Sequence, residues 1–224
     1  MKRSRLNSDH TTQDRSKGYS LWLMPTGRVY SELTRLIFRL SREWSTDNFE
    51  PHVTLLGGLL DSEEAILSKT SQLAAWIRPY EIKLTTMDYL DEFFRCLFFR
   101  VETTESVMDA NLKARSLFKR RRNPKHVPHL SLMYGNFGSP VKEKIIANIG
   151  CESDLRFKVR TICILDYRQT ERLVQSKRIH FEIGQRVLVA AVPWLLVEAH
   201  LPHFGGQSWA SKLRGELDHL PFWR

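Results

Sequence analysis

The sequence predicts an α+β fold built from two related halves, and three observations lead to that prediction. The 224 residues are 42% hydrophobic and 26% charged, a composition typical of a soluble globular chain long enough to bury a core. Strand-like and helix-like segments follow one another in mixed order, without the strict alternation of a parallel α/β sheet. Two similar eight-residue segments lie 77 residues apart. That separation is too long for a solenoid repeat and fits two halves of one domain related by a pseudo-twofold axis.

The first elements follow from local patterns. Tyr19 to Met24 (YSLWLM) is typical of a strand, which a proline and a glycine then end. Apolar residues recur at helical spacing over 29–44, which predicts an amphipathic helix. A second helix is expected to begin at Asp61, which with Glu64 forms a capping-box pattern, and to run to the break at Pro79.

The middle of the chain predicts a hairpin and a third helix. Residues 81–89 and 94–101 have strand composition, and the short link between them favours an antiparallel pair. A helix is expected from near Thr104 to the basic run before Pro124. Its expected core contacts are Val107, Ala114, Leu117 and Phe118.

The last elements are a short helix over 141–149 and strands over 155–166 and 179–183. The longest apolar run, 187–197, is shorter than the roughly 20 residues a membrane-spanning helix needs and is interrupted by Pro193. It therefore predicts a buried strand or a short core helix, and no membrane partner.

These patterns divide the chain into three parts. Residues 1–18 form a polar, basic tail that we expect to be disordered, and residues 19–184 form the folded domain. Residues 185–224 form an extension of unknown role, and its three tryptophans favour docking on the domain over a free interaction tail.

The compartment is inferred from two features. The chain starts with no apolar segment of the kind that a secretory signal requires, and its three cysteines have no paired spacing. We therefore expect a monomer in the cytoplasm, with the nucleus as an alternative.

The net charge of +9 is concentrated in two places. Residues 1–17 contain five bases and two acids, and residues 113–125 contain seven bases and no acid. These segments carry +3 and +7, so the remainder of the chain sums to −1. The basicity is therefore two local features on a neutral body.

The internal repeat joins PHVTLLGG at 51–58 to PHLSLMYG at 128–135, without gaps. Four of the eight positions are identical and three more exchange similar residues. The one dissimilar position pairs Gly57 with Tyr134, which predicts an asymmetric site.

Each repeat predicts a strand that presents an imidazole and a hydroxyl on one face. In a strand, residues i and i+2 point the same way, so His52 lies beside Thr54 and His129 beside Ser131. If the halves pack about a twofold axis, the two pairs converge on one cleft.

Two imidazoles with ordinary pKa values near 6.5 can serve as a neutral base and a cationic acid, while hydroxyls donate hydrogen bonds to an anion. That set is suited to metal-free hydrolysis of a phosphodiester.

With these residues the sequence resembles the 2H phosphoesterases, and within them the fungal and plant cyclic phosphodiesterase branch. The resemblance covers residues 19–184 and rests on PHVTLLGGL, VPHLSLMYG and the opening YSLWLMPTG. It implies a bilobal fold of two antiparallel sheets with flanking helices and an active-site groove between the lobes. It also implies that His52 and His129 are the catalytic acid and base, in an order the sequence leaves open, and that Thr54, Ser131 and Tyr134 contact the phosphate.

The resemblance implies a substrate class as well. The branch hydrolyses nucleoside 2′,3′-cyclic phosphates to 2′-phosphates, and ADP-ribose 1″,2″-cyclic phosphate, without a metal or other cofactor. Relatives process RNA ends or 2′-5′ linkages, so RNA is the alternative partner. A catalytically silent scaffold or RNA-binding module is a further alternative.

The basic run beside the second motif could attract that substrate. Its bases are Lys119, Arg120, Arg121, Arg122 and Lys125. A cleft lined by one sign of charge raises the local concentration of an anion. The same residues could instead be a solvated helix end, or a nuclear import signal.

Two H-x-x-H patterns invite a metal interpretation. On a strand, His126 and His129 would face opposite sides, and neither this pair nor His200 with His203 has an evident third ligand. We therefore expect no metal site.

Overall fold

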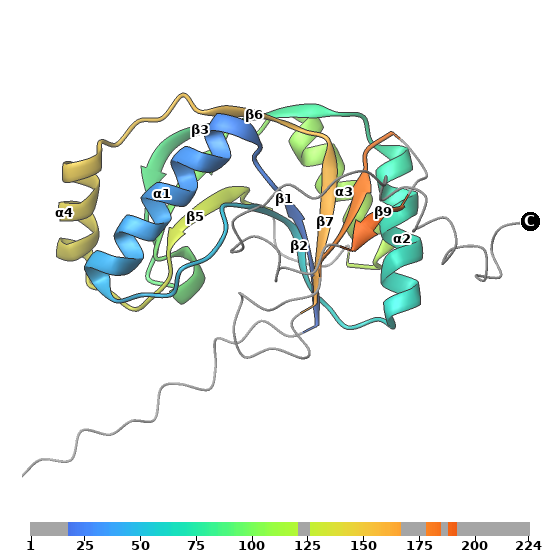
Figure 1. Cartoon of the computed structure of the whole chain (residues 1–224), viewed down its shortest axis with the longest axis horizontal. Helices are drawn as coiled ribbons and strands as arrows, with labels where there is room; N and C mark the ends of the chain where they lie inside the picture. Colours follow the sequence, from blue (N-terminus) through green and yellow to red (C-terminus); the bar gives the residue numbers. More distant parts are fainter. Residues whose placement is uncertain (1–17, 121–125, 167–177, 185–187, 192–224) are drawn as a thin grey trace, which may run out of the picture. The chain divides into compact units, whose positions relative to one another are not determined.

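The computed structural model describes residues 18–120, 126–166, 178–184 and 188–191 (Figure 1). Expectations for the polar tail, for residues 192–224 and for part of the basic run lie outside these residues.

The described elements form two successive β-α-β-α-β units and a final hairpin. The first unit contains β1 (Tyr19–Leu23), α1 (Gly27–Trp44), β2 (Val53–Leu59), α2 (Glu63–Trp76) and β3 (Tyr80–Asp88). The second contains β4 (Leu97–Val101), α3 (Glu105–Leu117), β5 (His129–Met133), α4 (Ser139–Ile149) and β7 (Thr161–Asp166), with β6 (Arg156–Val159) inserted before β7. The hairpin is β8 (Arg178–Glu182) and β9 (Leu188–Ala191). The expected α+β class is confirmed.

All strands pair antiparallel in one nine-stranded sheet of order β6-β3-β4-β5-β2-β1-β7-β8-β9. The two expected sheets are the two halves of this sheet. They join between β2 and β5 through the pairing of Val53 with Leu130, which are equivalent residues of the repeat. The neighbouring pairings of Thr54 with Trp22 and of Ser131 with Phe98 also match across the repeat. The pseudo-twofold axis therefore passes between the two motifs.

The two units exchange parts across this axis. Helix α1 of the first unit packs against β5 of the second, and α3 packs against β2. Strand β3 likewise pairs with β4, and β7 pairs with β1. Figure 1 shows α1 and α4 beside the β3–β5 half and α2 beside the β7–β9 half. Each half of the sheet is thus completed by the other unit, and one apolar core runs through both.

Strand 155–166 was expected to be continuous, and the structure corrects this. The chain breaks at Arg160, whose carbonyl accepts a hydrogen bond from the Ile183 amide (2.8 Å). Strand β6 pairs with β3 at one edge of the sheet, whereas β7 pairs with β1 near the other. One residue joins strands six places apart in the sheet order, so the sheet must curl. Local composition carries no information about such a change of partner.

The start of α2 also differs from the expectation. Ser62, and not Asp61, is the N-cap, and its hydroxyl accepts a hydrogen bond from the Ala65 amide (3.3 Å). Asp61 instead forms an ion pair with Lys69 in the second turn of the helix. The serine is the residue whose side chain reaches the free amide of the first turn.

Two further boundaries move. The segment 94–101 is a strand only from Leu97, because Phe93–Arg95 forms a short 3₁₀ turn, η1, before it. Helix α3 ends at Leu117, before the basic run, and Lys119 lies in the left-handed region with φ 55°. The basic run is therefore not the last turn of a helix. The expected hairpin of β3 with β4 and the expected core contacts of α3 are confirmed.

Within the apolar run 187–197, Leu188–Ala191 forms the strand β9, which pairs with β8. The remaining residues of the run lie outside the described residues. None of the helices in the described ranges is long and apolar enough to cross a bilayer.

Candidate active site

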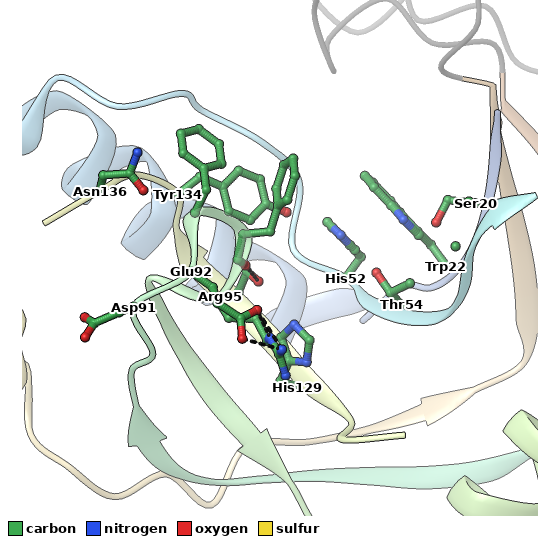
Figure 2. Close-up of a pocket in the computed structure, with 15 residues that line it drawn as sticks. Ser20, Trp22, His52, Thr54, Asp91, Glu92, Arg95, His129, Tyr134 and Asn136 are labelled. Atoms are coloured by element: carbon green, nitrogen blue, oxygen red, sulfur yellow. Dashed lines mark hydrogen bonds and ion pairs between the residues drawn. The ribbon is translucent and has the colours of Figure 1, made fainter. Parts of the chain in front are cut away.

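His52 and His129 lie at the join of the two halves and line one cavity of about 500 Å³ (Figure 2). His52 immediately precedes β2, and His129 is the first residue of β5. The other lining residues are Ser20, Trp22, Thr54, Gly57, Gly58, Asp91, Glu92, Phe93, Phe94, Arg95, Ser131, Tyr134 and Asn136. The structure therefore brings together all five residues expected to be catalytic or to contact phosphate.

Both imidazoles are held in the same way. The Nδ1 atom of His52 lies 2.7 Å from the carbonyl oxygen of Glu50, and that of His129 lies 2.9 Å from the carbonyl oxygen of Val127. Because a carbonyl only accepts hydrogen bonds, Nδ1 carries the proton in each ring. Each Nε2 atom is then the lone-pair nitrogen, the atom through which the neutral ring can accept a proton.

The surroundings of His52 are apolar. The ring is stacked on Trp22, with centroids 3.3 Å apart and planes within 4°, and Phe49 lies edge-on at 6.2 Å. His52 is only 5% exposed. Burial, and then the electrostatic influence of His129, lower the pKa of His52 well below its ordinary value of 6.5.

The surroundings of His129 are more polar. Phe98 meets its ring edge-on at 5.2 Å, and a charged pair, Glu92 with Arg95, lies on the same side of the cavity (Figure 2). Burial lowers the pKa of His129 and the bond to Val127 raises it, while Arg95 lowers and Glu92 raises the same pKa. The net direction is downward, so both rings are neutral above pH 6.5.

The three side chains expected to contact phosphate differ in their hydrogen bonds and in their burial. Thr54 lines the cavity beside His52. The Ser131 hydroxyl donates a hydrogen bond to the Phe94 carbonyl (2.9 Å), so it must rotate before it can donate to a ligand. Tyr134 is buried and stacked on Phe49 at 3.9 Å, and this burial raises the pKa of its phenol. The phenol therefore stays a neutral hydrogen-bond donor.

The cavity has two unlike ends, as the exchange of Gly57 for Tyr134 predicted. At the first end, Ser20, Gly57 and Gly58 present small side chains and backbone. The second end has the aromatic rings of Phe93, Phe94 and Tyr134. Equivalent positions on the two sides of the pseudo-twofold axis thus offer open space on one side and flat apolar surface on the other.

The basic run reaches the first of these ends. The Arg120 guanidinium donates a hydrogen bond to the Gly58 carbonyl (2.7 Å), and Lys119 is exposed beside it. Arg121, Arg122 and Lys125 lie outside the described residues. The basic run therefore starts beside the cavity, where Arg120 is bonded to the lining residue Gly58.

Several lining residues were not expected from the sequence. Ser20 and Trp22 are two apart on β1, so the period of a strand was the signal that they share a face. Glu92, Phe93 and Arg95 gave no such signal, because residues 92 and 93 were expected in a short link and Arg95 in the strand 94–101, whereas Phe93–Arg95 forms a 3₁₀ turn with Glu92 as its N-cap. Among the described residues, no group of three or more His, Cys, Asp or Glu side chains is arranged to hold a metal ion.

Comparison with known proteins places this geometry in context. Residues 17–183 match the model of a family described as cyclic phosphodiesterase-like protein. The chain is also similar to a cyclic phosphodiesterase of Arabidopsis thaliana, with 28% identity over 127 residues, which are 56% of this chain and 69% of the plant protein.

Two solved structures share the fold. Escherichia coli LigT, in complex with NADP⁺, has a TM-score of 0.54 at 12% identity, over 76% of this chain and 100% of LigT. A Thermus thermophilus protein has a TM-score of 0.52 at 15% identity, over 79% of this chain and 97% of its own.

Proposed function

The chain belongs to the cyclic phosphodiesterase-like family of 2H phosphoesterases, and from that premise we propose that it hydrolyses a nucleotide cyclic phosphate, using His52 and His129 and no metal. The substrate is a nucleoside 2′,3′-cyclic phosphate, opened to the 2′-phosphate, or ADP-ribose 1″,2″-cyclic phosphate, opened to the 1″-phosphate.

One observation carries the proposal. Two imidazoles with the same tautomer, set by equivalent carbonyl contacts, line a single cavity from pseudo-twofold-related strands. Hydrolysis of a cyclic phosphodiester needs a proton removed from the attacking water and a proton given to the leaving oxygen. Two rings that both use Nε2 supply these two groups.

The reaction balances over the two rings. One Nε2 takes a proton from water as the water oxygen forms a bond to phosphorus. The bond from phosphorus to one ribose oxygen breaks, and the protonated Nε2 of the other ring gives its proton to that oxygen. Thr54, Ser131 and Tyr134 donate hydrogen bonds to the non-bridging oxygens, where negative charge increases.

The acid must be protonated for this step, although burial lowers the pKa of both rings. A cyclic phosphate is an anion, and an anion within a few ångströms favours the charged form of an imidazole. Substrate binding between the rings therefore raises the pKa of the ring that serves as acid.

The test is turnover by the purified full chain in the presence of EDTA. We expect hydrolysis of one of the two cyclic phosphates, and a loss of about 10²- to 10⁴-fold in His52→Ala and in His129→Ala. His180→Ala is the matched control, because His180 is a half-buried sheet histidine that does not line the cavity. Full activity in either motif variant would contradict the mechanism.

A second candidate function is action on RNA ends. It is favoured by Arg120, which brings the start of the basic run to the small-residue end of the cavity. A strand that continues past the cyclic phosphate would meet these bases there. Each phosphate neutralised on a single strand contributes about −0.7 to the log–log salt dependence of binding.

One variant with two charge reversals distinguishes the candidates. If Arg121→Glu with Arg122→Glu weakens oligonucleotide binding and reduces the salt slope, but leaves turnover of a cyclic mononucleotide unchanged, RNA is the substrate favoured by the basic run. If turnover and binding fall together, the run serves the small substrate as well.

We also propose that the protein works as a monomer in a reducing compartment, the cytoplasm or the nucleus. Cys96, Cys151 and Cys163 are free thiols, the state in which a reducing compartment keeps cysteines.

A further inference from the structure

One wall of the cavity is a short segment whose two ends are held by different contacts. We call residues 90–95 the lip; it contains η1 and contributes Asp91, Glu92, Phe93, Phe94 and Arg95 to the cavity. Asp91 and Glu92 are exposed, and the other lip residues are only partly buried. Phe93 and Phe94 pack against the core and against Tyr134, so it is the earlier part of the lip, Leu90 and Asp91, whose position depends on bonds made to it by another element.

Two hydrogen bonds to the later half of the lip come from β5 and from the residues just after it. The Ser131 hydroxyl donates to the Phe94 carbonyl (2.9 Å), and the Gly135 amide donates to the Phe93 carbonyl (3.0 Å). The lip also closes on itself, because the Leu90 amide donates to the Arg95 carbonyl (2.9 Å). These bonds hold the later half of the lip against the strand that carries His129.

The earlier half of the lip is held from α4 by Lys142. Its ammonium donates to the Leu90 carbonyl (2.9 Å) and to the Asp91 carboxylate (2.6 Å), and lies 5.0 Å from the centre of the Tyr89 ring. The next helix residue, Glu143, accepts a hydrogen bond from the Tyr89 hydroxyl (2.8 Å). The partners of the ammonium named here are thus three consecutive residues: Tyr89 and the first two residues of the lip.

Lys142 is 1% exposed, whereas the side chain of its carboxylate partner Asp91 is 85% exposed. A buried ammonium is stable only while it keeps its hydrogen bonds and its counter-charge. If the lip moved away, the cation would lose its hydrogen bonds to Leu90 and Asp91, and with Asp91 its counter-charge, at once. An exposed carboxylate, by contrast, is readily solvated by water. The energetic penalty for opening the lip therefore falls on Lys142.

From this arrangement we infer that Lys142 is a positioning residue that fixes the lip, and through it the Glu92–Arg95 pair, beside His129. The activity arm of the test below rests on the proposed function, whereas the exchange arm does not. In the lip, Arg95 and Glu92 act on His129 in opposite directions, so a displaced lip changes the environment of that ring and not of His52.

The variant that tests this is Lys142→Met, which keeps an unbranched chain and leaves no buried charge behind. Its matched control is Lys144→Met, two residues along α4 and exposed. The primary readout is amide hydrogen exchange in the substrate-free full chain. The Leu90 and Gly135 amides are the reporters, because both are bonded to lip carbonyls.

In Lys142→Met we expect the two reporter amides to exchange about tenfold faster or more, while amides of β1 and α1 keep their wild-type rates. We expect kcat/KM for the cyclic phosphate to fall about 10- to 100-fold, with a pH profile shifted from that of the wild type. Lys144→Met should match the wild type in every readout.

Two results would overturn the inference: wild-type exchange at the reporters in Lys142→Met, or faster exchange throughout the chain, which would make Lys142 a general core residue. If Lys142→Met does not fold, Asp91→Asn takes its place. Faster hydrogen exchange confined to the two reporter amides would then support the inference, and unchanged exchange at these amides would overturn it. A wild-type protein that hydrolyses no cyclic phosphate would remove the proposed function and leave the exchange result in force.

Discussion

The two motifs supply the same imidazole and hydroxyl but surround them differently. His52 lies flat against Trp22 among apolar rings, whereas His129 meets only the edge of Phe98 and has a charged pair nearby. The backbone contacts of the two rings are nevertheless alike. The repeat thus determines that Nε2 is the proton-accepting nitrogen of each ring, while residues outside the motifs determine the pKa of each ring.

The largest effect on activity is expected when both imidazole rings are removed. If His52 and His129 act in one step, His52→Ala with His129→Ala should lose little more activity than the worse single variant, because groups that act as a unit are not additive. Each single loss is expected at about 10²- to 10⁴-fold. Single-turnover rates of the three variants provide the measurement, and multiplicative losses would contradict joint action.

The two hydroxyls give the next largest effect. Thr54→Val and Ser131→Ala should each lower kcat by about 10²- to 10³-fold if each hydroxyl donates to the reacting phosphate. Only Ser131→Ala should also lose stability, by about 1 kcal/mol, because only Ser131 is seen bonded to a backbone carbonyl, that of Phe94. Urea denaturation separates the two variants. Equal stability losses would mean that this bond has no special role.

The aromatic neighbours are expected to have a smaller effect. Trp22→Phe leaves His52 less covered, so the pKa of His52 should rise toward its ordinary value, because burial is the main cause of its depression. Phe98→Leu, at the equivalent position, should change the pKa of His129 less, because Phe98 touches that ring only by its edge. Proton NMR titration of the two rings measures both. A larger shift at His129 than at His52 would reverse the comparison.

The smallest expected effect is on stability against pH. Burial, followed by the electrostatic influence of His129 and Arg115, lowers the pKa of His126 from 6.5 to about 4. The unfolded chain therefore binds this proton first as pH falls, so the contribution of neutral His126 to stability is present above pH 6.5 and is lost progressively between 6.5 and about 4. The melting temperature of His126→Gln should accordingly fall less steeply over that range. Parallel melting curves for variant and wild type would show that His126 is not buried as described.

The sequence predicted those parts of the fold that depend on local periodicity. A strand places His52 with Thr54, and His129 with Ser131, whatever its neighbours are, and the repeat then predicted that the pairs meet. The break at Arg160 and the turn at Phe93–Arg95 were not predicted, because both depend on which distant strand a segment pairs with. For the same reason the flat contact of Trp22 with His52 lay beyond sequence reasoning, although their faces could be predicted.

The pairing of β1 with β7 also bears on how the protein comes to be folded. Trp22 lies opposite Cys163, and Tyr19 opposite Asp166, so the strand that carries Trp22 gains one of its two neighbours only from the far end of the second unit. Contacts between residues so distant along a chain form slowly, because a long loop must close before they stabilise anything. During synthesis, both histidines emerge from the ribosome before β7 does. At that stage the catalytic residues are present, but one edge of β1 has no strand to pair with. In such a nascent chain that edge of β1 is exposed to other strands until residue 166 emerges. In this protein the sheet around Trp22 is therefore completed only after both histidines have been synthesised.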